Sequence, residues 1–235
     1  MKPAPRMTLA AHFRELKSRI IYSALFFLAT LIMGFFAAPY MHSIMTAPLL
    51  SSVDHAELIY TGLSDGLAIQ FRLAGLFAVL TSMPFVLFQV FKYVAPALKR
   101  TEKRLIIPLM ILSPVLFVMG ASFAYFLLLP LMFEFMAGLA NPEIRLLPDM
   151  KNYLKFSIDI LRAFGIAFQL PLFLVLLNRT GVVSRQWLMK SSRYMIVGIF
   201  VLAAVLTPPD LLSLVLLALP LLVLFFASFL FMKKS

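Results

Sequence analysis

The sequence predicts an all-α integral membrane protein whose six transmembrane helices form a single membrane domain over residues 1–235. Hydrophobic residues make up 62% of the chain and charged residues 13%, whereas a soluble domain is usually about half apolar and about a quarter charged. The apolar residues occur in long blocks and not in alternation, which favours helices over a β-barrel. Because only these two structures satisfy every backbone hydrogen bond inside hydrocarbon, the blocks are interpreted as membrane-spanning helices.

Six apolar blocks are separated by polar links. The expected spans are about residues 20–39, 73–90, 105–133, 153–177, 194–206 and 211–232. The segment 7–19 precedes the first block and carries Leu9, Phe13 and Leu16 at helical spacing, so we expect a short amphipathic helix at the membrane surface there. Pro84 in the second span should kink its helix, because proline removes a backbone hydrogen bond.

The fourth and fifth spans are unusual. The fourth contains Lys155, Asp159, Arg162 and Gln169, and charged groups inside a span usually face a partner or a water-filled cavity. Asp159 and Arg162 can pair along one helix face, so a structural ion pair and a functional polar site both remain open. The fifth span is short, at about 20 Å against a hydrocarbon core of about 30 Å. It either thins the bilayer and binds another helix or begins earlier than its hydropathy suggests.

The basic residues predict the orientation of the chain. Of the 21 Lys and Arg residues, 16 lie in the N-terminal segment, the second and fourth links and the C-terminal tail, which places both termini on the cytoplasmic side. Topology and anionic lipid explain these bases, and we expect no nucleic-acid partner. Only two of the ten acids, Glu15 and Glu102, lie among them. Each either pairs with a neighbouring base or receives a cationic ligand through bidentate hydrogen bonds.

Several kinds of chemistry find no support in the sequence. The chain has no cysteine, and its three histidines form no cluster with carboxylates, so we expect no metal site and no cofactor. The stretch Gly62–Gly66 matches a G-x-S-x-G nucleophile elbow, but that pattern is meaningful only at a strand-to-helix turn. An intramembrane hydrolase that uses Ser64 is therefore the weakest interpretation, and we expect no enzyme.

With these residues in view, the chain resembles the TatC family, the multispanning core subunit of the twin-arginine protein translocase. The resemblance covers about residues 11–231 and is specific through the combination of several motifs in one order. They are His12–Arg19 before the first span, Ala47–Leu49 after it, Pro84, Phe88–Phe91, Tyr93–Leu98, Glu102, Phe164–Pro171 and Leu206–Asp210.

The resemblance implies a receptor in the bacterial cytoplasmic (inner) membrane that binds the twin-arginine signal peptides of folded cargo at the cytoplasmic face. It also implies TatA/TatB-type single-span partners, use of the proton-motive force, a homo-oligomer within a complex, and kinked helices that form a cup-like concave face. By position it assigns signal-peptide binding to Glu15, Lys17, Arg19, Tyr93, Pro96 and Glu102, a periplasmic cap to Pro48, Thr207, Pro208, Pro209 and Asp210, and partner docking to Gln169, Ala204 and Val205. Asp159 and Arg162 add polarity to that docking region.

Two departures from the family pattern bear on mechanism. Gln169 stands where Glu is common, and an amide can form hydrogen bonds but cannot titrate. Lys17 stands where Arg is usual, which keeps the charge and loses the planar fork. The alternative function is a small secondary transporter with its polar site in the fourth span. That class predicts inverted repeats and paired broken helices, and the sequence shows neither.

Overall fold

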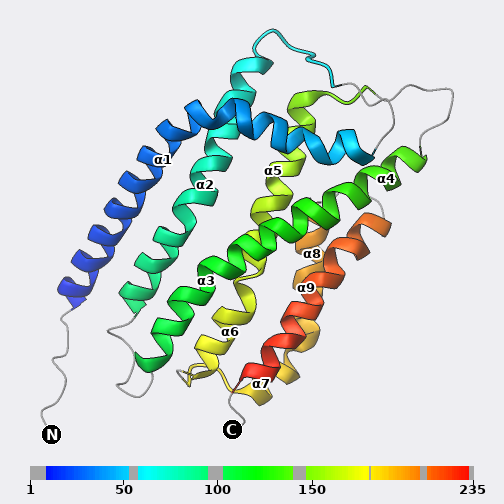
Figure 1. Cartoon of the computed structure of the whole chain (residues 1–235). Helices are drawn as coiled ribbons and strands as arrows, with labels where there is room; N and C mark the ends of the chain where they lie inside the picture. Colours follow the sequence, from blue (N-terminus) through cyan, green and yellow to red (C-terminus); the bar gives the residue numbers. More distant parts are fainter. Residues whose placement is uncertain are drawn as a thin grey trace, which may run out of the picture.

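The computed structural model describes residues 9–52, 58–94, 103–139, 147–179, 181–206 and 211–232. Within these residues the chain is almost entirely helical (Figure 1). The elements in chain order are α1 (Leu9–Ser52), α2 (Asp65–Val94), α3 (Lys103–Phe123), the π-helical segment η2 (Ala124–Leu128), α4 (Leu129–Leu139), α5 (Met150–Ala167), α6 (Leu170–Arg179), α7 (Arg185–Lys190), α8 (Ser192–Leu206) and α9 (Leu211–Phe231).

The described helices confirm the predicted all-α membrane class. Five helical stretches are long and apolar enough to cross a bilayer: His12–Ser51, Asp65–Tyr93, Pro108–Gly138, Met150–Arg179 and Leu214–Phe231. The sixth expected span is the shorter apolar helix α8, of 15 residues, which reaches about 22 Å. It begins at Ser192, two residues before the predicted start, and the separate helix α7 precedes it, so the span gains little length on its N-terminal side.

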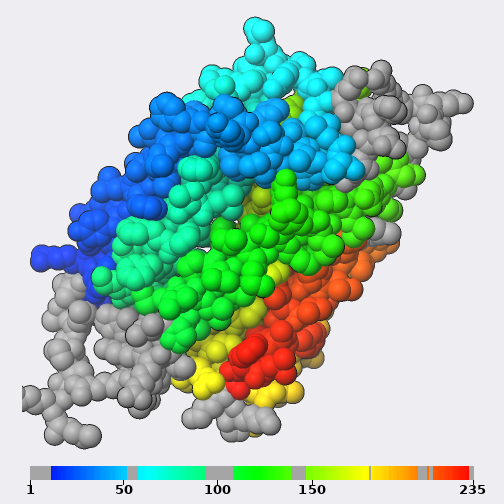
Figure 2. Space-filling view, viewed as in Figure 1, coloured from blue at the N-terminus to red at the C-terminus, as the bar shows by residue number. Residues whose placement is uncertain are grey.

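The bundle has two distinct ends, which we name by their position in Figure 1. The start of α1, the end of α2 and the end of α9 lie at one end, together with α7; this is the terminal end. The end of α1, the start of α2, the end of α4 and the start of α5 lie at the opposite, distal end. In the space-filling view, α1, α2 and α3–α4 form adjoining blue, teal and green bands (Figure 2).

The first helix differs from the prediction at both of its ends. The segment 7–19 is not a separate amphipathic helix, because from Leu9 onward it belongs to α1, which continues for 44 residues. No proline or glycine interrupts the chain between Leu9 and Gly34, so the helix has no reason to stop where the polar segment ends. The helix also continues past residue 39 through Pro39 and Pro48. Internal proline bends a helix, and α1 bends over the distal end of the bundle (Figure 1).

The third and fourth spans are longer and less regular than predicted. The third runs without a gap through α3, η2 and α4, from Lys103 to Leu139. The fourth is divided into α5 and α6 by a turn at Phe168 and Gln169. Pro171 explains this division, because it cannot donate a backbone hydrogen bond and its ring disfavours helix in the residues before it. The backbone N–H of Gln169 instead donates to the Ile166 carbonyl oxygen at 2.9 Å.

Close approach between helices depends on glycines at two crossings. A Cβ atom on Gly34 of α1 would lie 2.6 Å from the Ala74 carbonyl oxygen of α2. At the α3–α5 crossing, a Cβ on Gly120 would lie 2.5 Å from the Phe164 carbonyl oxygen, and one on Gly165 would lie 2.5 Å from the Phe117 ring. These helices therefore pack backbone against backbone, as small residues allow inside membranes.

A network of polar contacts, which we call the distal clamp, joins the start of α2 to the start of α5. Asp65 is 2% exposed and accepts hydrogen bonds from the Gly62 amide at 2.6 Å and from Lys151 at 3.0 Å. Thr61 donates to Asp149 at 3.0 Å, and the other carboxylate oxygen of Asp149 caps α5 through the Asn152 amide. The G-x-S-x-G stretch is thus explained as the turn that begins α2.

Candidate functional site

A charged group lies at the terminal end, where α1 and α2 run antiparallel. Arg19 of α1 donates one hydrogen bond to the Gln89 side-chain oxygen of α2 at 2.9 Å and one to the Glu15 carboxylate at 3.2 Å. Glu15 and Arg19 are one helical turn apart, so both face α2. We call these three residues the terminal cluster.

The Glu15 carboxylate is only partly satisfied within the described part of the chain. Its Oε1 atom accepts from Arg19, whereas its Oε2 atom is buried and has no hydrogen-bond partner there. The Glu15 side chain is 19% exposed. A shielded carboxylate oxygen without a donor is costly, and a guanidinium group supplies the planar pair of N–H donors that such an oxygen needs.

Aromatic contacts surround the terminal cluster. His12 stacks on Tyr93 with ring centroids 4.5 Å apart and an interplanar angle of 20°. About two helical turns beyond Arg19, Phe26 of α1 stacks on Phe85 of α2 with ring centroids 4.5 Å apart. The cluster therefore lies between stacked rings of the same helix pair, with apolar surface on both sides.

The structure brings together some of the predicted signal-peptide residues. Glu15 and Arg19 are in direct contact, and Tyr93 lies on the neighbouring helix end, stacked on His12. Lys17 is exposed and lies about 200° around α1 from Glu15, at 3.6 residues per turn, so it does not join the cluster. Pro96, Glu102 and the predicted cap residues Thr207, Pro208, Pro209 and Asp210 lie outside the described residues.

The polar residues of the fourth span have different environments. Gln169 is held by Ser113 of α3: its Oε1 accepts from the Ser113 hydroxyl at 2.6 Å and its Nε2 donates to the Ser113 carbonyl at 2.8 Å. Asp159 and Arg162 form no ion pair with each other, and the Arg162 Nε atom is buried without a partner in the described chain. The predicted docking residues Ala204 and Val205 of α8 are exposed, Val205 by 77%.

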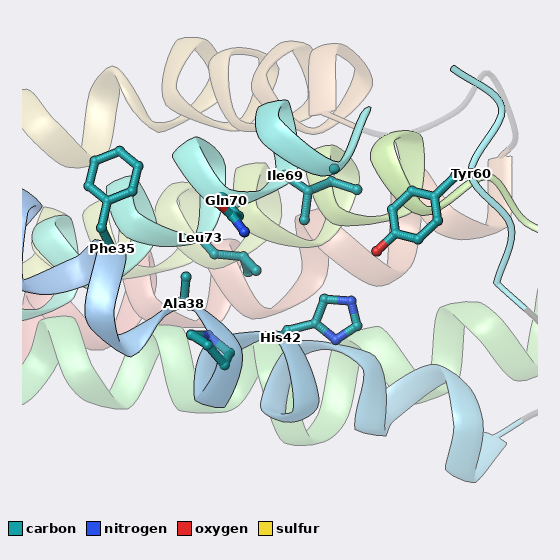
Figure 3. A pocket seen from close by; sticks show the side chains of 9 residues that line it. Phe35, Ala38, His42, Tyr60, Ile69, Gln70 and Leu73 are labelled. Carbon is teal, nitrogen blue, oxygen red and sulfur yellow. The ribbon is translucent and has the colours of Figure 1, made fainter. Parts of the chain in front are cut away.

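The distal end contains an open cavity of about 420 Å³ between α1 and α2. Figure 3 shows the His42 ring and the Tyr60 hydroxyl turned toward the same space, with Gln70 and Leu73 on the adjacent helix. Pro48, predicted in the cap, is buried in the same bent half of α1.

Sequence reasoning missed the polar partners that position these groups. Gln89 is 7% exposed and Ser113 is fully buried, and neither was assigned a role. A weak signal existed for Gln89, because an amide in an apolar span near a charged boundary needs a partner. No group of His, Asp and Glu that could hold a metal ion is found among the described residues.

Comparisons with known proteins agree over nearly the whole chain. The family model described as Sec-independent protein translocase protein (TatC) matches residues 11–220. A Sec-independent protein translocase protein TatC of Azotobacter chroococcum is 38% identical over 220 residues, which cover 93% of this chain and 86% of the relative. The Escherichia coli K12 protein of the same name is 34% identical over 218 residues, which cover 92% and 84%.

A solved structure is similar in three dimensions as well. The crystal structure described as twin arginine translocase receptor TatC, in the detergent DDM, superposes with a TM-score of 0.88 at 35% identity. The match covers 94% of this chain and 99% of the crystallised chain. At this identity and coverage, the likeness extends to sequence and fold together.

Proposed function

Because the chain belongs to the TatC family of Sec-independent protein translocase proteins, we propose that it is the receptor subunit that binds twin-arginine signal peptides of folded cargo. A translocase component is a transport protein and not a catalyst of bond chemistry. The ligand is an extended cationic peptide, and the terminal cluster is its binding site.

The observation that carries this proposal is the half-satisfied Glu15 carboxylate. Arg19 holds Oε1 and is itself held by Gln89, so the Glu15 side chain is fixed before any ligand arrives. Its Oε2 atom is buried and has no donor in the described chain, so a guanidinium from the peptide satisfies it once the ligand displaces the side chains that cover it. A charge-assisted pair in such a shielded place is stronger than one in water.

Two arginines require two acceptors, and we assign the second role to Glu102. It is the other acid among the bases of the predicted cytoplasmic face. Tyr93, stacked on His12 beside the cluster, and Pro96 supply apolar surface for the residues that flank the arginine pair. The net charge of +11 would repel a cationic peptide at long range, so local carboxylates are needed to recognise it.

In this proposal the protein lies in a bacterial cytoplasmic membrane. The terminal end faces the cytoplasm, so that both ends of the chain are on the cytoplasmic side. The distribution of Lys and Arg supports this orientation, and the relatives are bacterial proteins. TatA/TatB-type single-span helices dock at Gln169 and along the exposed, short α8 at Ala204 and Val205. The protein works as a homo-oligomer within that complex and uses the proton-motive force.

The alternative, a secondary transporter, finds its support in Asp159 and Arg162, two charges in one span that form no pair. Its third predicted residue, Gln169, has both side-chain polar groups engaged by Ser113. A transport site needs polar groups that can exchange partners, so this arrangement favours the receptor over the transporter.

The test is binding of a synthetic twin-arginine signal peptide to the purified protein, beside a twin-lysine peptide. The receptor proposal expects the first to bind and the second to bind much more weakly, and it expects Glu15→Gln and Glu102→Gln each to weaken binding. Glu134→Gln is the matched control, because Glu134 is an exposed acid on α4 outside the proposed site. Equal binding of the two peptides would refute the receptor proposal and favour the transporter, which requires Asp159.

A further inference from the structure

The geometry points to a second binding site, centred on Arg162, for a membrane-embedded helix that carries one carboxylate. This inference rests on the proposed function in one respect, namely that single-span helices dock on the chain. It adds a place and a chemistry that differ from the docking region at Gln169 and α8.

The Arg162 side chain has no hydrogen-bond or ion-pair partner in the described part of the chain. Its Nε atom is buried without a hydrogen-bond partner in the described chain, and Asp159, one turn earlier, does not pair with it. A Cβ atom on Gly75 of α2 would lie 3.6 Å from the Arg162 Nη2 atom, so the guanidinium lies along a stretch of α2 that has no side chain. Arginine stays charged at any ordinary pH, and therefore Arg162 needs an acceptor from elsewhere.

Arg162 lines an apolar cavity. The cavity measures about 420 Å³ and is lined by residues of α1, α2, α3 and α5. Phe27, Val79 and Phe117 make its walls apolar, while Arg162 is the charged residue of the lining. Ile166, at the same cavity, is 58% exposed, so the cavity opens to the outside of the bundle. An apolar recess with one cation is complementary to an acidic side chain carried on an apolar surface.

The position of Arg162 along α5 indicates how deep the site lies in the membrane. Arg162 follows Met150, the first residue of α5, by twelve positions, which is about 18 Å along a helix. In a hydrocarbon core about 30 Å thick, that distance places Arg162 near the middle of the membrane. A phospholipid phosphate lies at the membrane surface, so the acceptor must be a carboxylate that a transmembrane helix carries to this depth.

The experiment exploits the absence of cysteine from the chain. Ile166→Cys then gives the full-length protein a single thiol at the mouth of the cavity. The protein is reconstituted in phosphatidylcholine vesicles with a synthetic leucine-rich peptide of about 20 residues that has one Glu at its midpoint and one Cys a turn away. The control peptide has Gln in place of Glu. An added thiol oxidant drives the cross-linking, and disulfide formation is measured at about pH 8.

We expect the Glu peptide to cross-link at least about tenfold more than the Gln peptide, as for a close charge pair. Arg162→Gln should remove this difference, and Arg162→Lys should retain part of it because the charge remains. Arg162→Glu should prefer a peptide with Lys at its midpoint. Arg162→Lys and Arg162→Glu keep the test decisive if Arg162→Gln folds poorly. Equal cross-linking of the Glu and Gln peptides, or none, would overturn the inference.

Two further arms separate this inference from the proposed function and from lipid binding. Val205→Cys on α8 should cross-link both peptides whatever residue stands at 162. Cross-linking at 205 but not at 166 refutes the Arg162 site alone, and failure at both positions also refutes helix docking on α8. Arg162-dependent binding of oleate without binding of the Glu peptide, read by native mass spectrometry, would make the occupant a free acid and the helix inference wrong.

Discussion

Each end of the bundle contains a carboxylate beside a basic side chain, and the two carboxylates differ in how completely they are hydrogen-bonded. In the distal clamp, Asp65 is buried against Lys151 and the Gly62 amide, so both of its oxygens have donors. In the terminal cluster, Glu15 has a donor on one oxygen and none, within the described chain, on the other. The satisfied carboxylate joins two helices, whereas the half-satisfied one needs an explanation, and we propose that a ligand supplies its missing donor.

The largest effect should separate the two ends directly. Glu15→Gln removes the charge that the ligand guanidinium needs and keeps the shape of the side chain. Loss of one partner of a shielded charge pair typically costs about 2–5 kcal/mol, which is at least about a 30-fold loss of affinity for the twin-arginine peptide. Titration calorimetry or fluorescence anisotropy with the purified protein measures it.

The reciprocal variant sharpens the same comparison. Lys151→Met leaves the Asp65 carboxylate buried without its cation, so the thermal transition should fall while peptide affinity stays unchanged. Glu15→Gln should show the opposite pattern, with affinity lost and the thermal transition nearly unchanged. A large loss of affinity in Lys151→Met would contradict the division of roles between the two ends.

The next largest loss of peptide affinity is expected when Gln89, which holds Arg19 in the terminal cluster, is replaced. Gln89→Leu takes away the acceptor that fixes Arg19 at 2.9 Å, so Arg19 and Glu15 lose their preset geometry. We expect about tenfold weaker peptide binding, or about 1.4 kcal/mol, as for the loss of one hydrogen bond to a charged group. Gln70→Leu is the control, because it makes the same change on the same helix at an exposed position. Equal losses in both variants would show that the effect is general to α2.

A smaller effect is expected in the scaffold of the distal end. The Tyr153 hydroxyl donates to the Met45 carbonyl at 2.6 Å in a buried place, and the Tyr125 hydroxyl donates to the Ile44 carbonyl at 2.6 Å in an exposed one. Tyr153→Phe should lower the free energy of unfolding by about 1 kcal/mol. Tyr125→Phe should cost less, because this hydrogen bond is exposed and its polar groups are less shielded than those of Tyr153 and Met45. Thermal unfolding in detergent compares the pair, and a greater loss in Tyr125→Phe would contradict the burial argument.

The sequence contains enough information for the class of fold because that class depends on composition and block length. Long apolar blocks without alternation favour helices over a barrel, and the described residues contain five long apolar helical stretches and a shorter sixth. Helix ends were harder to predict. Polar residues before the first span suggested a boundary, yet helix continuity depends on breakers, and none occurs between Leu9 and Gly34.

The candidate site could be predicted only in part. Glu15 was identifiable because an acid among many bases is conspicuous in the sequence, and its role in binding stays a prediction. Its connection to Gln89 depends on the register in which α1 packs on α2, which Gly34 permits through close contact with Ala74. Pro171 could have predicted the break between α5 and α6 at Gln169. Hydropathy could not, because a break of one turn does not change the average hydropathy of the span. The register of α1 against α2 depends on tertiary packing, so the sequence of either helix alone does not determine it.

The smallest expected effect tests that register at the terminal cluster. Lys17 was assigned to the signal-peptide site by resemblance, yet it is exposed and points away from the α1 face that holds Glu15 and Arg19. Lys17→Gln should therefore change peptide affinity by no more than about twofold, since exposed substitutions usually stay within about 0.5 kcal/mol. The measurement is the same titration, with Glu15→Gln as the positive control. A tenfold loss would mean that the peptide wraps around α1 and contacts both of its faces, and the binding site would then extend beyond the α1–α2 contact that organises it.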